Sequence, residues 1–272
     1  MTVIAAPRTD GRLPALRVTA SETGKGLRLM WRRRAMLLTG AVAQGFTYLM
    51  IEFLVGGGHL NHAVLALTLP AYFAFSLAAT AALQGSGGIA EEVNGGTLEQ
   101  SHLSPARPSL LMADRLAALA TEGLLPAAAV TAAFWAGYGV RYQVRPDVLV
   151  PLLLTITDAL AYALLMTALT LAIASIGAVV HVFNMAVMFF GGMFVPAAVF
   201  PHGVEIFARF IPTTLGAQVL NTTLAGRPLS AAWADGTLPW LLAHAAVLSA
   251  LAWMLYLYTL RRARREGGLS PR

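Results

Sequence analysis

Three long stretches of the chain carry no charged residue, and they set its predicted architecture. Residues 53–90, 159–204 and 236–260 contain no Asp, Glu, Lys or Arg. A helix that crosses a bilayer needs about 20 mostly apolar residues, so each stretch has room for one or two crossings. We therefore predict an all-α integral membrane protein with six transmembrane helices, at about residues 35–56, 63–84, 115–138, 148–171, 177–200 and 237–260.

No charge marks the joint between the fourth and fifth predicted spans. Residues 147–200 are nevertheless too long for a single crossing, since a helix rises about 1.5 Å per residue and the apolar core of a bilayer is about 30 Å thick. We place a turn near Ser175. Within the fifth span, Gly191-Gly192 and Pro196 predict close packing or a kink.

Basic residues predict the orientation of the spans. Six crossings put both termini on one side, and fifteen of the 19 Lys and Arg residues then fall on that side. The opposite side receives only Arg141, Arg145, Arg209 and Arg227. Short cytoplasmic segments are enriched in Lys and Arg. We therefore predict cytoplasmic tails at residues 1–20 and 261–272, and a multi-pass protein of the cytoplasmic (inner) membrane.

Residues 21–34 place basic side chains among apolar ones just before the first span. This pattern is typical of an amphipathic helix that lies at the interface of an anionic membrane and contacts its lipids. The alternative is a positive flank that merely stops the first span. The predicted membrane-interface residues are Lys25, Arg28, Trp31, Arg32, Arg33 and Arg34.

Composition supports a single membrane domain, residues 35–260, and argues against thiol chemistry and nucleic-acid binding. The chain is 57% hydrophobic and 12% charged, whereas soluble domains carry about 25% charged residues. It contains no Cys, so it offers no disulfide, thiolate metal site or thiol nucleophile. Its net charge of +6 comes mostly from the two ends, which we interpret as topology and not as a nucleic-acid interface.

The connection after the second span, residues 86–114, has structural signals of its own. A turn pattern, a capping box and a helix stop follow one another at Asn94-Gly95-Gly96, at Thr97 with Gln100, and at Ser104-Pro105. They predict a short, acid-flanked helix held just below the membrane by two spans. Such a helix suits docking into a cleft on a soluble partner, and a solvated loop is the alternative.

A family signature is visible in the same connection. Glu92, Gly96-Thr97-Leu98-Glu99-Gln100, Leu103 and Ser104-Pro105 resemble the signature of type-2 ATP-binding-cassette exporter permeases. The likeness extends to the basic N-terminal helix, the six-span order and the external segment before the last span. Val93 and Ile211-Pro212 depart from it, because the family often has a basic residue and an Asn-Pro pair at these places.

The resemblance implies a coupling helix that contacts a separate ATPase subunit, with ATP and Mg bound there, and a second permease copy as homodimer or heterodimer. The chain itself lacks a phosphate loop, because Gly24-Lys25 has Thr19 where the pattern needs Gly and Gly26 where it needs Ser or Thr. We predict no cofactor or metal on this chain. The candidate ATPase-coupling residues are Glu91, Glu92, Gly96, Thr97, Leu98, Glu99, Gln100, Leu103, Pro105 and Arg107.

Polar residues inside the predicted spans are candidates for a transport pathway, because ionisable groups at membrane depth are costly and usually face a cavity or a partner. Asp158 is the deepest, with Thr155 and Tyr162 on its helical face, whereas Glu52 has the option of snorkelling to the interface. Structural hydrogen bonding and core packing are the alternatives for the whole set. The pathway candidates are Asp158, Glu122, Tyr162, His181, Asn184, Met188 and Phe189.

The external segment, residues 201–236, is too long and apolar for a simple loop. Apolar residues at helical spacing precede Pro212, Glu205 and Arg209 form an i, i+4 pair, and Thr213-Thr214 can cap a second helix through Leu220. We predict a re-entrant helical hairpin that gates the pathway, with Phe207, Phe210 and Pro212 as candidate gate residues. A static cap is the alternative.

Together these features predict a non-enzymatic permease subunit of an ATP-driven exporter. It would move a lipophilic or amphiphilic compound, a drug or lipid, or a lipid-linked glycan out of the cell by alternating access. One alternative is an ion-coupled secondary transporter with Asp158 and Glu122 as proton sites. A membrane-embedded lipid-modifying enzyme is a weaker one, because the acids are scattered and Ser86 has no recognisable catalytic partner.

Overall fold

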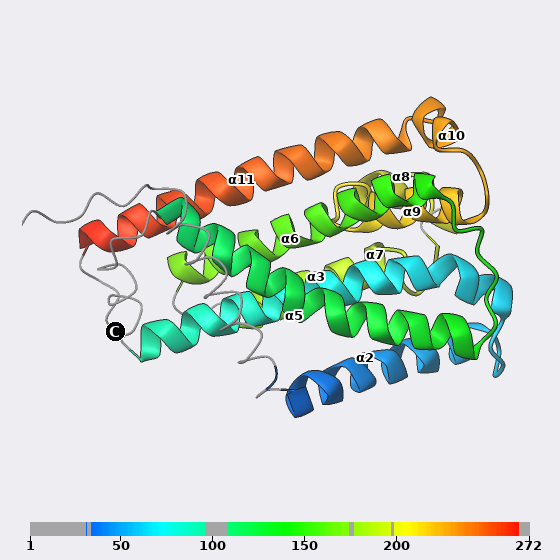
Figure 1. The fold of residues 1–272 in the computed structure, drawn as a ribbon, viewed down its shortest axis with the longest axis horizontal. Coiled ribbons are helices and arrows are strands. Elements are labelled where there is room, and N and C mark those ends of the chain that lie inside the picture. The colour runs from blue at the N-terminus through cyan, green and yellow to red at the C-terminus, as the bar shows by residue number, and fades with distance from the viewer. Residues whose placement is uncertain (1–30, 32–33, 96–107, 174–176, 197–198, 267–272) are drawn as a thin grey trace, which may run out of the picture.

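The computed structural model describes residues 31, 34–95, 108–173, 177–196 and 199–266, and within them the regular structure is helical. The helices are α2 (Arg34–Val55), α3 (His62–Asn94), α5 (Pro108–Gly137), η1 (Pro146–Val148), α6 (Leu149–Ala172), α7 (Gly177–Phe190), α8 (His202–Ala208), α9 (Thr214–Leu224), α10 (Leu229–Ala234) and α11 (Thr237–Glu266). The long helices run side by side, and α8, α9 and α10 gather at one end of the bundle (Figure 1), here called the α10 end. The predicted all-α class is confirmed.

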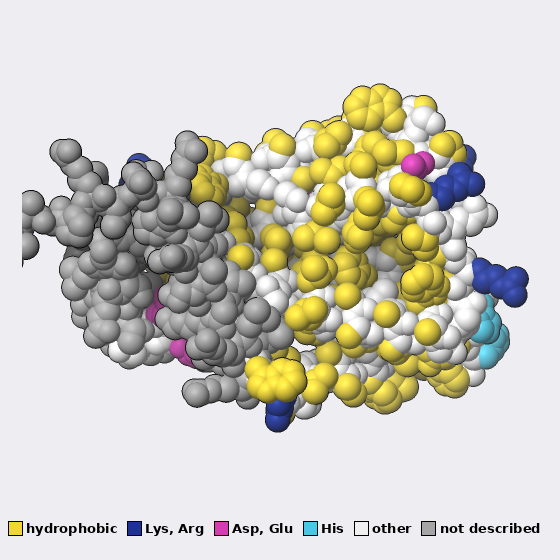
Figure 2. All heavy atoms as spheres, viewed as in Figure 1, with side chains coloured by type: hydrophobic (Ala, Val, Ile, Leu, Met, Phe, Trp, Pro, Cys, Tyr) yellow, Lys and Arg dark blue, Asp and Glu magenta, His cyan; other side chains and the backbone are white. Residues whose placement is uncertain are grey.

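Five of the described helices are long and apolar enough to cross a membrane: α2, α3, α5, α6 and α11. Hydrophobic side chains spread over the middle of the face seen in Figure 2, and Arg and His side chains mark its edge at the α10 end. α3 is the central helix, because the apolar part of its span is 72% buried, against 22% for α2 and for α11. It packs on α5 and α6, and α11 packs along α6.

The connection predicted to begin at residue 86 begins later, because Gly85, Ser86, Gly87 and Gly88 lie inside α3. Packing overrides the low helix propensity of glycine here. A Cβ at Gly85 would collide with the hydroxyl of Thr167 on α6, so only glycine lets the two helices approach this closely. One turn further on, Ile89 is also buried. The helix therefore continues to Asn94, and most of the predicted coupling helix falls at residues 96–107, outside the described residues.

The predicted fifth span is shorter than expected. α7 ends at Phe190 after 14 residues, where a full crossing needs about 20. The chain turns at Gly192, whose φ of 84° is left-handed. Gly191 lies against Thr213, since a Cβ on it would be 3.1 Å from the Thr213 hydroxyl. The helix of the predicted fifth span therefore ends ten residues before Phe200, and the close packing predicted at Gly191-Gly192 is present.

The predicted pair of helices in the external segment is present as α8 and α9, and a third short helix, α10, follows them. The expected threonine cap is wrong. Thr213 precedes α9 with a φ of 78° and makes no side-chain capping bond. Its hydroxyl is buried without a hydrogen-bond partner, and its backbone N–H is the group that finds a partner across the bundle.

Of the predicted membrane-interface helix, residues 21–34, the structure describes only Trp31 and Arg34. The Arg34 guanidinium carbon lies 4.8 Å from the centroid of the Trp31 ring, a cation–π contact. Lys25, Arg28, Arg32 and Arg33 lie outside the described residues, and the interfacial helix stays a prediction.

Pro70 opens the hydrogen-bond ladder of α3 where two other segments attach. A proline has no N–H, so the carbonyl of Ala66 loses its usual partner within the helix. Tyr142, in the connection between α5 and η1, donates its hydroxyl to that carbonyl at 2.9 Å. Asn221 of α9 donates its side-chain amide to the next carbonyl, that of Leu67, at 2.7 Å. Burial raises the pKa of Tyr142, so the phenol remains a donor at neutral pH.

A double-mutant cycle tests this exchange of partners. We expect Tyr142→Phe to lower the free energy of unfolding by about 1 to 3 kcal/mol, because the Ala66 carbonyl loses its donor. In a Pro70→Ala background the same change should cost less, since the new N–H at position 70 can serve that carbonyl. Unfolding of the purified protein in detergent measures both costs. Equal costs in the two backgrounds would contradict the proposed role of Pro70.

Candidate functional site

A buried carboxylate joins three parts of the bundle. Asp158 lies in the middle of α6 and is 1% exposed. One of its oxygens is 2.8 Å from Nδ1 of His244 on α11. The other accepts the backbone N–H of Thr213 at 2.9 Å. Since Thr213 sits at the corner between α8 and α9, a single side chain ties this corner to two long helices.

The corner itself is strained. A left-handed φ is unfavourable for a β-branched residue such as Thr213 and costs about 1 to 3 kcal/mol. The conformation directs the Thr213 N–H at Asp158 and leaves its carbonyl to accept from Ala217 in the first turn of α9. The carboxylate therefore stabilises a backbone geometry that the sequence alone would disfavour.

The hydrogen bonds of His244 fix how many protons it shares with Asp158. Its Nε2 lies 3.2 Å from the carbonyl oxygen of Phe210, and a carbonyl oxygen only accepts, so Nε2 must carry a proton. The bond to Asp158 then requires one further proton, either on Nδ1 or on the carboxyl group. Loss of that proton would leave two acceptors facing each other. The pair therefore shares one proton between Nδ1 and the carboxyl group, and His244 also holds Phe210 in place.

A close helix contact flanks this pair. Gly216 of α9 packs directly on Thr155 of α6, where any Cβ would collide with the threonine side chain. Thr155 satisfies its own hydroxyl by donating to Pro151 one turn earlier, at 2.7 Å. Thr155 and Asp158 share a helical face, as predicted, and this face meets α9 and α11.

The other pathway candidates do not gather around Asp158. Tyr162 donates its hydroxyl to the Asn184 side-chain oxygen on α7 at 2.7 Å, so these two form a separate link between helices. Glu122 is half-buried on α5. His181 and Phe189 are exposed on α7, while Met188 packs against the core.

Two features of the site were missed by the sequence analysis. His244 carried a usable signal, since it is a lone ionisable residue within the last uncharged stretch. Snorkelling of Glu52 to the interface was one option, but the side chain is 2% exposed, and its Oε1 has no hydrogen-bond partner. It lies beside the hydrogen-bonded pair Tyr48 and Thr68, which are in contact at 2.8 Å.

Aromatic contacts place the three candidate gate residues. Phe207 of α8 packs edge to face on Phe190 at the end of α7, with ring centroids 5.1 Å apart. Phe210 meets Trp240 of α11 in the same way at 6.4 Å. Pro212 lies in the corner that precedes Thr213. All three therefore lie at the junctions of the external segment with α7, α6 and α11.

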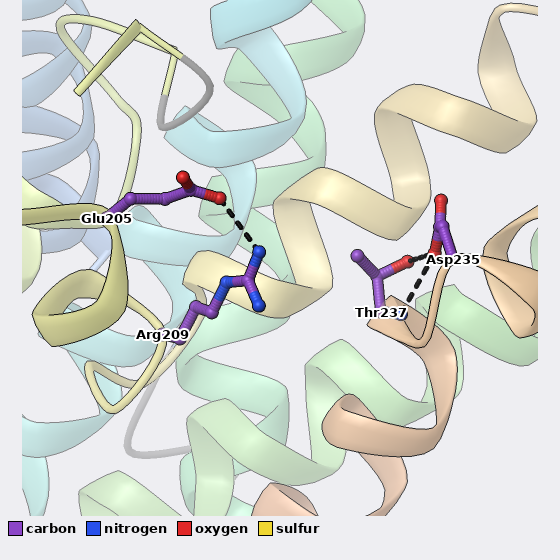
Figure 3. A network of polar contacts seen from close by, with 4 residues as sticks. All are labelled: Glu205, Arg209, Asp235 and Thr237. Carbon is purple, nitrogen blue, oxygen red and sulfur yellow. Dashed lines mark hydrogen bonds and ion pairs between the residues drawn. The ribbon is translucent and has the colours of Figure 1, made fainter. Parts of the chain in front are cut away.

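Polar pairs frame this segment (Figure 3). Arg209 donates to Glu205 at 2.8 Å, which confirms the predicted i, i+4 pair. Asp235 accepts from the hydroxyl and from the N–H of Thr237 at the start of α11, at 2.6 and 2.9 Å. These hydrogen bonds lower the pKa of Asp235, so it stays ionised and favours the N-terminal end of the helix.

At the other end of the bundle an ion pair brackets the predicted coupling segment. Glu92, near the end of α3, pairs with Arg115 of α5. Glu91 is exposed beside it. The remaining coupling candidates, Gly96, Thr97, Leu98, Glu99, Gln100, Leu103, Pro105 and Arg107, lie outside the described residues and stay predictions.

Comparison with known proteins agrees with the resemblance seen in the sequence. The model of one family, described as ABC-2 type transporter, matches residues 21–224. The match includes the predicted coupling segment, Asp158 and the corner at Thr213, and it stops before α11. No curated protein matches the chain.

Two substitutions separate the hydrogen bonds that Asp158 makes from its ability to carry a proton. Asp158→Leu should lower the thermal unfolding midpoint strongly, because it leaves the buried Thr213 N–H unsatisfied and breaks a buried pair, at a cost of about 3 kcal/mol. Asp158→Asn should be nearly neutral in the same assay. Its amide can donate to a neutral His244 and accept from Thr213, so all three hydrogen bonds persist. Equal losses in both variants would contradict this arrangement.

Proposed function

The chain belongs to the ABC-2 type transporter family, and from that premise we propose that it is the permease of an exporter driven by a separate ATPase subunit. We propose further that ATP and Mg bind to the partner, that two permease copies form the pathway, and that the cargo is a lipophilic or amphiphilic compound or a lipid-linked glycan. The absence of a phosphate loop from the sequence supports the assignment of ATP hydrolysis to another chain. The membrane would be the cytoplasmic one, with both termini inside.

One observation carries the proposal: a single helix connects the two ends of the bundle. α3 runs unbroken from His62 to Asn94, 33 residues in one helix. Its last turn enters the predicted coupling segment, and Glu92 braces it against α5. Near its first turns the Leu67 carbonyl holds Asn221 of α9. A push at residues 96–107 is therefore transmitted along α3 to the external segment.

The hydrogen bonds of Asp158 determine which elements can move when residues 96–107 are displaced. The corner between α8 and α9 is bonded to α6 and α11, and α9 is bonded to α3. The external segment cannot shift without moving these helices or breaking buried hydrogen bonds. This supports a gate that opens with the helices, in preference to a loop that moves alone. α7 has 14 residues, and together with the turn that follows it this helix would supply the fifth of the six predicted crossings.

The ion-coupled alternative rests on the exchangeable proton shared by Asp158 and His244. In that case Asp158→Asn would fold normally but would not transport. Under the proposed function the same variant exports with the partner ATPase. Glu122, the other candidate proton site, lies half-buried on α5.

The coupling segment gives the test of the proposed function. We expect Glu99→Gln to weaken binding of the partner ATPase by about tenfold, which corresponds to about 1.4 kcal/mol, because a charged contact is lost. Glu205→Gln removes the same charge at the opposite end of the bundle and should leave ATPase binding unchanged. Co-purification and export from cells measure binding and transport. Normal binding and export in the Glu99→Gln variant would refute the assignment.

A further inference from the structure

A pocket of about 340 Å³ opens on the side of the bundle between the end of α8 and one face of α11. Four of its lining residues come from α11: Trp240, Ala243, His244 and Val247, which follow the spacing of a single helix face. Ile206 and Phe210 form the facing wall, and Arg209 stands beside them. The pocket is therefore almost wholly apolar, with one strong cation among its walls.

The pocket opens towards the surface that α11 presents to lipid. Its apolar walls are well exposed, at 46% for Ile206, 62% for Phe210, 52% for Trp240 and 57% for Val247. Beyond Val247 the same side of α11 continues with Leu251 and Met254, which are 50% and 57% exposed. An apolar chain lying in the pocket can therefore extend along the helix without meeting a polar side chain among these residues.

One pair of opposite charges, Arg209 and Glu205, lies beside the pocket. Arg209 donates to Glu205, its Nε is buried without a hydrogen-bond partner, and its side chain is 39% exposed. Figure 3 shows Glu205 and Arg209 pointing towards each other. A guanidinium is suited to phosphate, which accepts hydrogen bonds from its fixed fork. A carboxylate immediately beside it is suited to an ammonium group, and it lowers the preference for a purely anionic headgroup.

From this arrangement we infer that the pocket binds a membrane phospholipid whose headgroup carries both a phosphate and a primary ammonium. The phosphate lies on Arg209, the ammonium lies near Glu205, and an acyl chain fills the groove between Ile206 and Val247. Trp240 and Phe210 stand at the rim, as aromatic residues do where the bilayer meets its headgroups. The pair of Arg209, in the pocket wall, and Glu205 beside it favours this lipid over a second copy of the chain, because the pair offers both halves of a zwitterion their counter-charge.

The bound lipid would also contact His244, the partner of Asp158. His244 forms part of the pocket wall while it holds Asp158 and the Phe210 carbonyl. Phe210 in turn is both a pocket wall and the residue next to the corner between α8 and α9. An occupied pocket therefore stabilises the position of the external segment that the structure shows.

Quenching of tryptophan fluorescence by lipids with brominated acyl chains tests the inference directly. The full-length protein is reconstituted without an ATPase, so the result does not depend on transport. The contribution of Trp240 is the difference between the wild type and Trp240→Phe. We expect brominated phosphatidylethanolamine to quench it with an apparent affinity about threefold above that of brominated phosphatidylcholine, a difference of the size of one exposed ion pair. Trp253, further along α11, should be quenched equally by both lipids.

Two variants with different effects complete the experiment. Arg209→Gln should lower the apparent affinity for both phosphatidylethanolamine and phosphatidylcholine, because the phosphate that the two lipids share loses its contact. Glu205→Gln should shift the preference to phosphatidylglycerol, because the unopposed guanidinium then favours an anionic headgroup. Native mass spectrometry of the wild type should show a retained phosphatidylethanolamine that Arg209→Gln loses. Equal quenching of Trp240 by all three lipids, or its protection from all of them by a second copy, would overturn the inference and leave the permease assignment intact.

Discussion

The arrangement of the α10 end depends on one buried hydrogen-bonded group, the carboxylate of Asp158. Both of its oxygens are used, one by the backbone of Thr213 and one by His244. A buried charge is tolerated only when it is paired and hydrogen-bonded, so this group selects a narrow set of positions for α6, α11 and the corner between α8 and α9. The left-handed conformation of Thr213 is stable only because of that arrangement.

Pro70 supplies the second connection by weakening α3 at one point. The helix gives up a hydrogen bond of its own, and the freed region receives donors from Tyr142 and Asn221. A proline in the middle of a span is thus used to attach other segments. In a membrane this exchange is possible because neighbouring elements satisfy the opened carbonyls. The external segment is consequently held from two sides, by α3 through α9 and by α6 with α11 through the corner.

Much of this fold is visible in the sequence, because uncharged stretches and the spacing of apolar residues report on each helix separately. The long helices, the pair of helices before the last span, the Glu205–Arg209 pair and the close packing at Gly191-Gly192 follow from such local signals. Contacts between distant segments do not. The helix through Gly85 depends on Thr167, the burial of Glu52 depends on α3, and the partnership of Asp158 with His244 joins residues 86 positions apart. No local pattern predicts a left-handed Thr213, since its conformation is set by an acceptor on another helix.

We propose that the external segment opens because α3 transmits motion to it through Asn221. The sequence contains no Cys, so a single spin label at Gly203, which is exposed on α8 with free space around it, is readily introduced into each permease copy. Pulsed EPR on the complex with its ATPase would give the distance between the two labels with and without ATP. We expect ATP to change this distance in the otherwise wild-type protein, but not in an Asn221→Leu variant whose ATPase partner still hydrolyses ATP. The same ATP-dependent change in both proteins would contradict it.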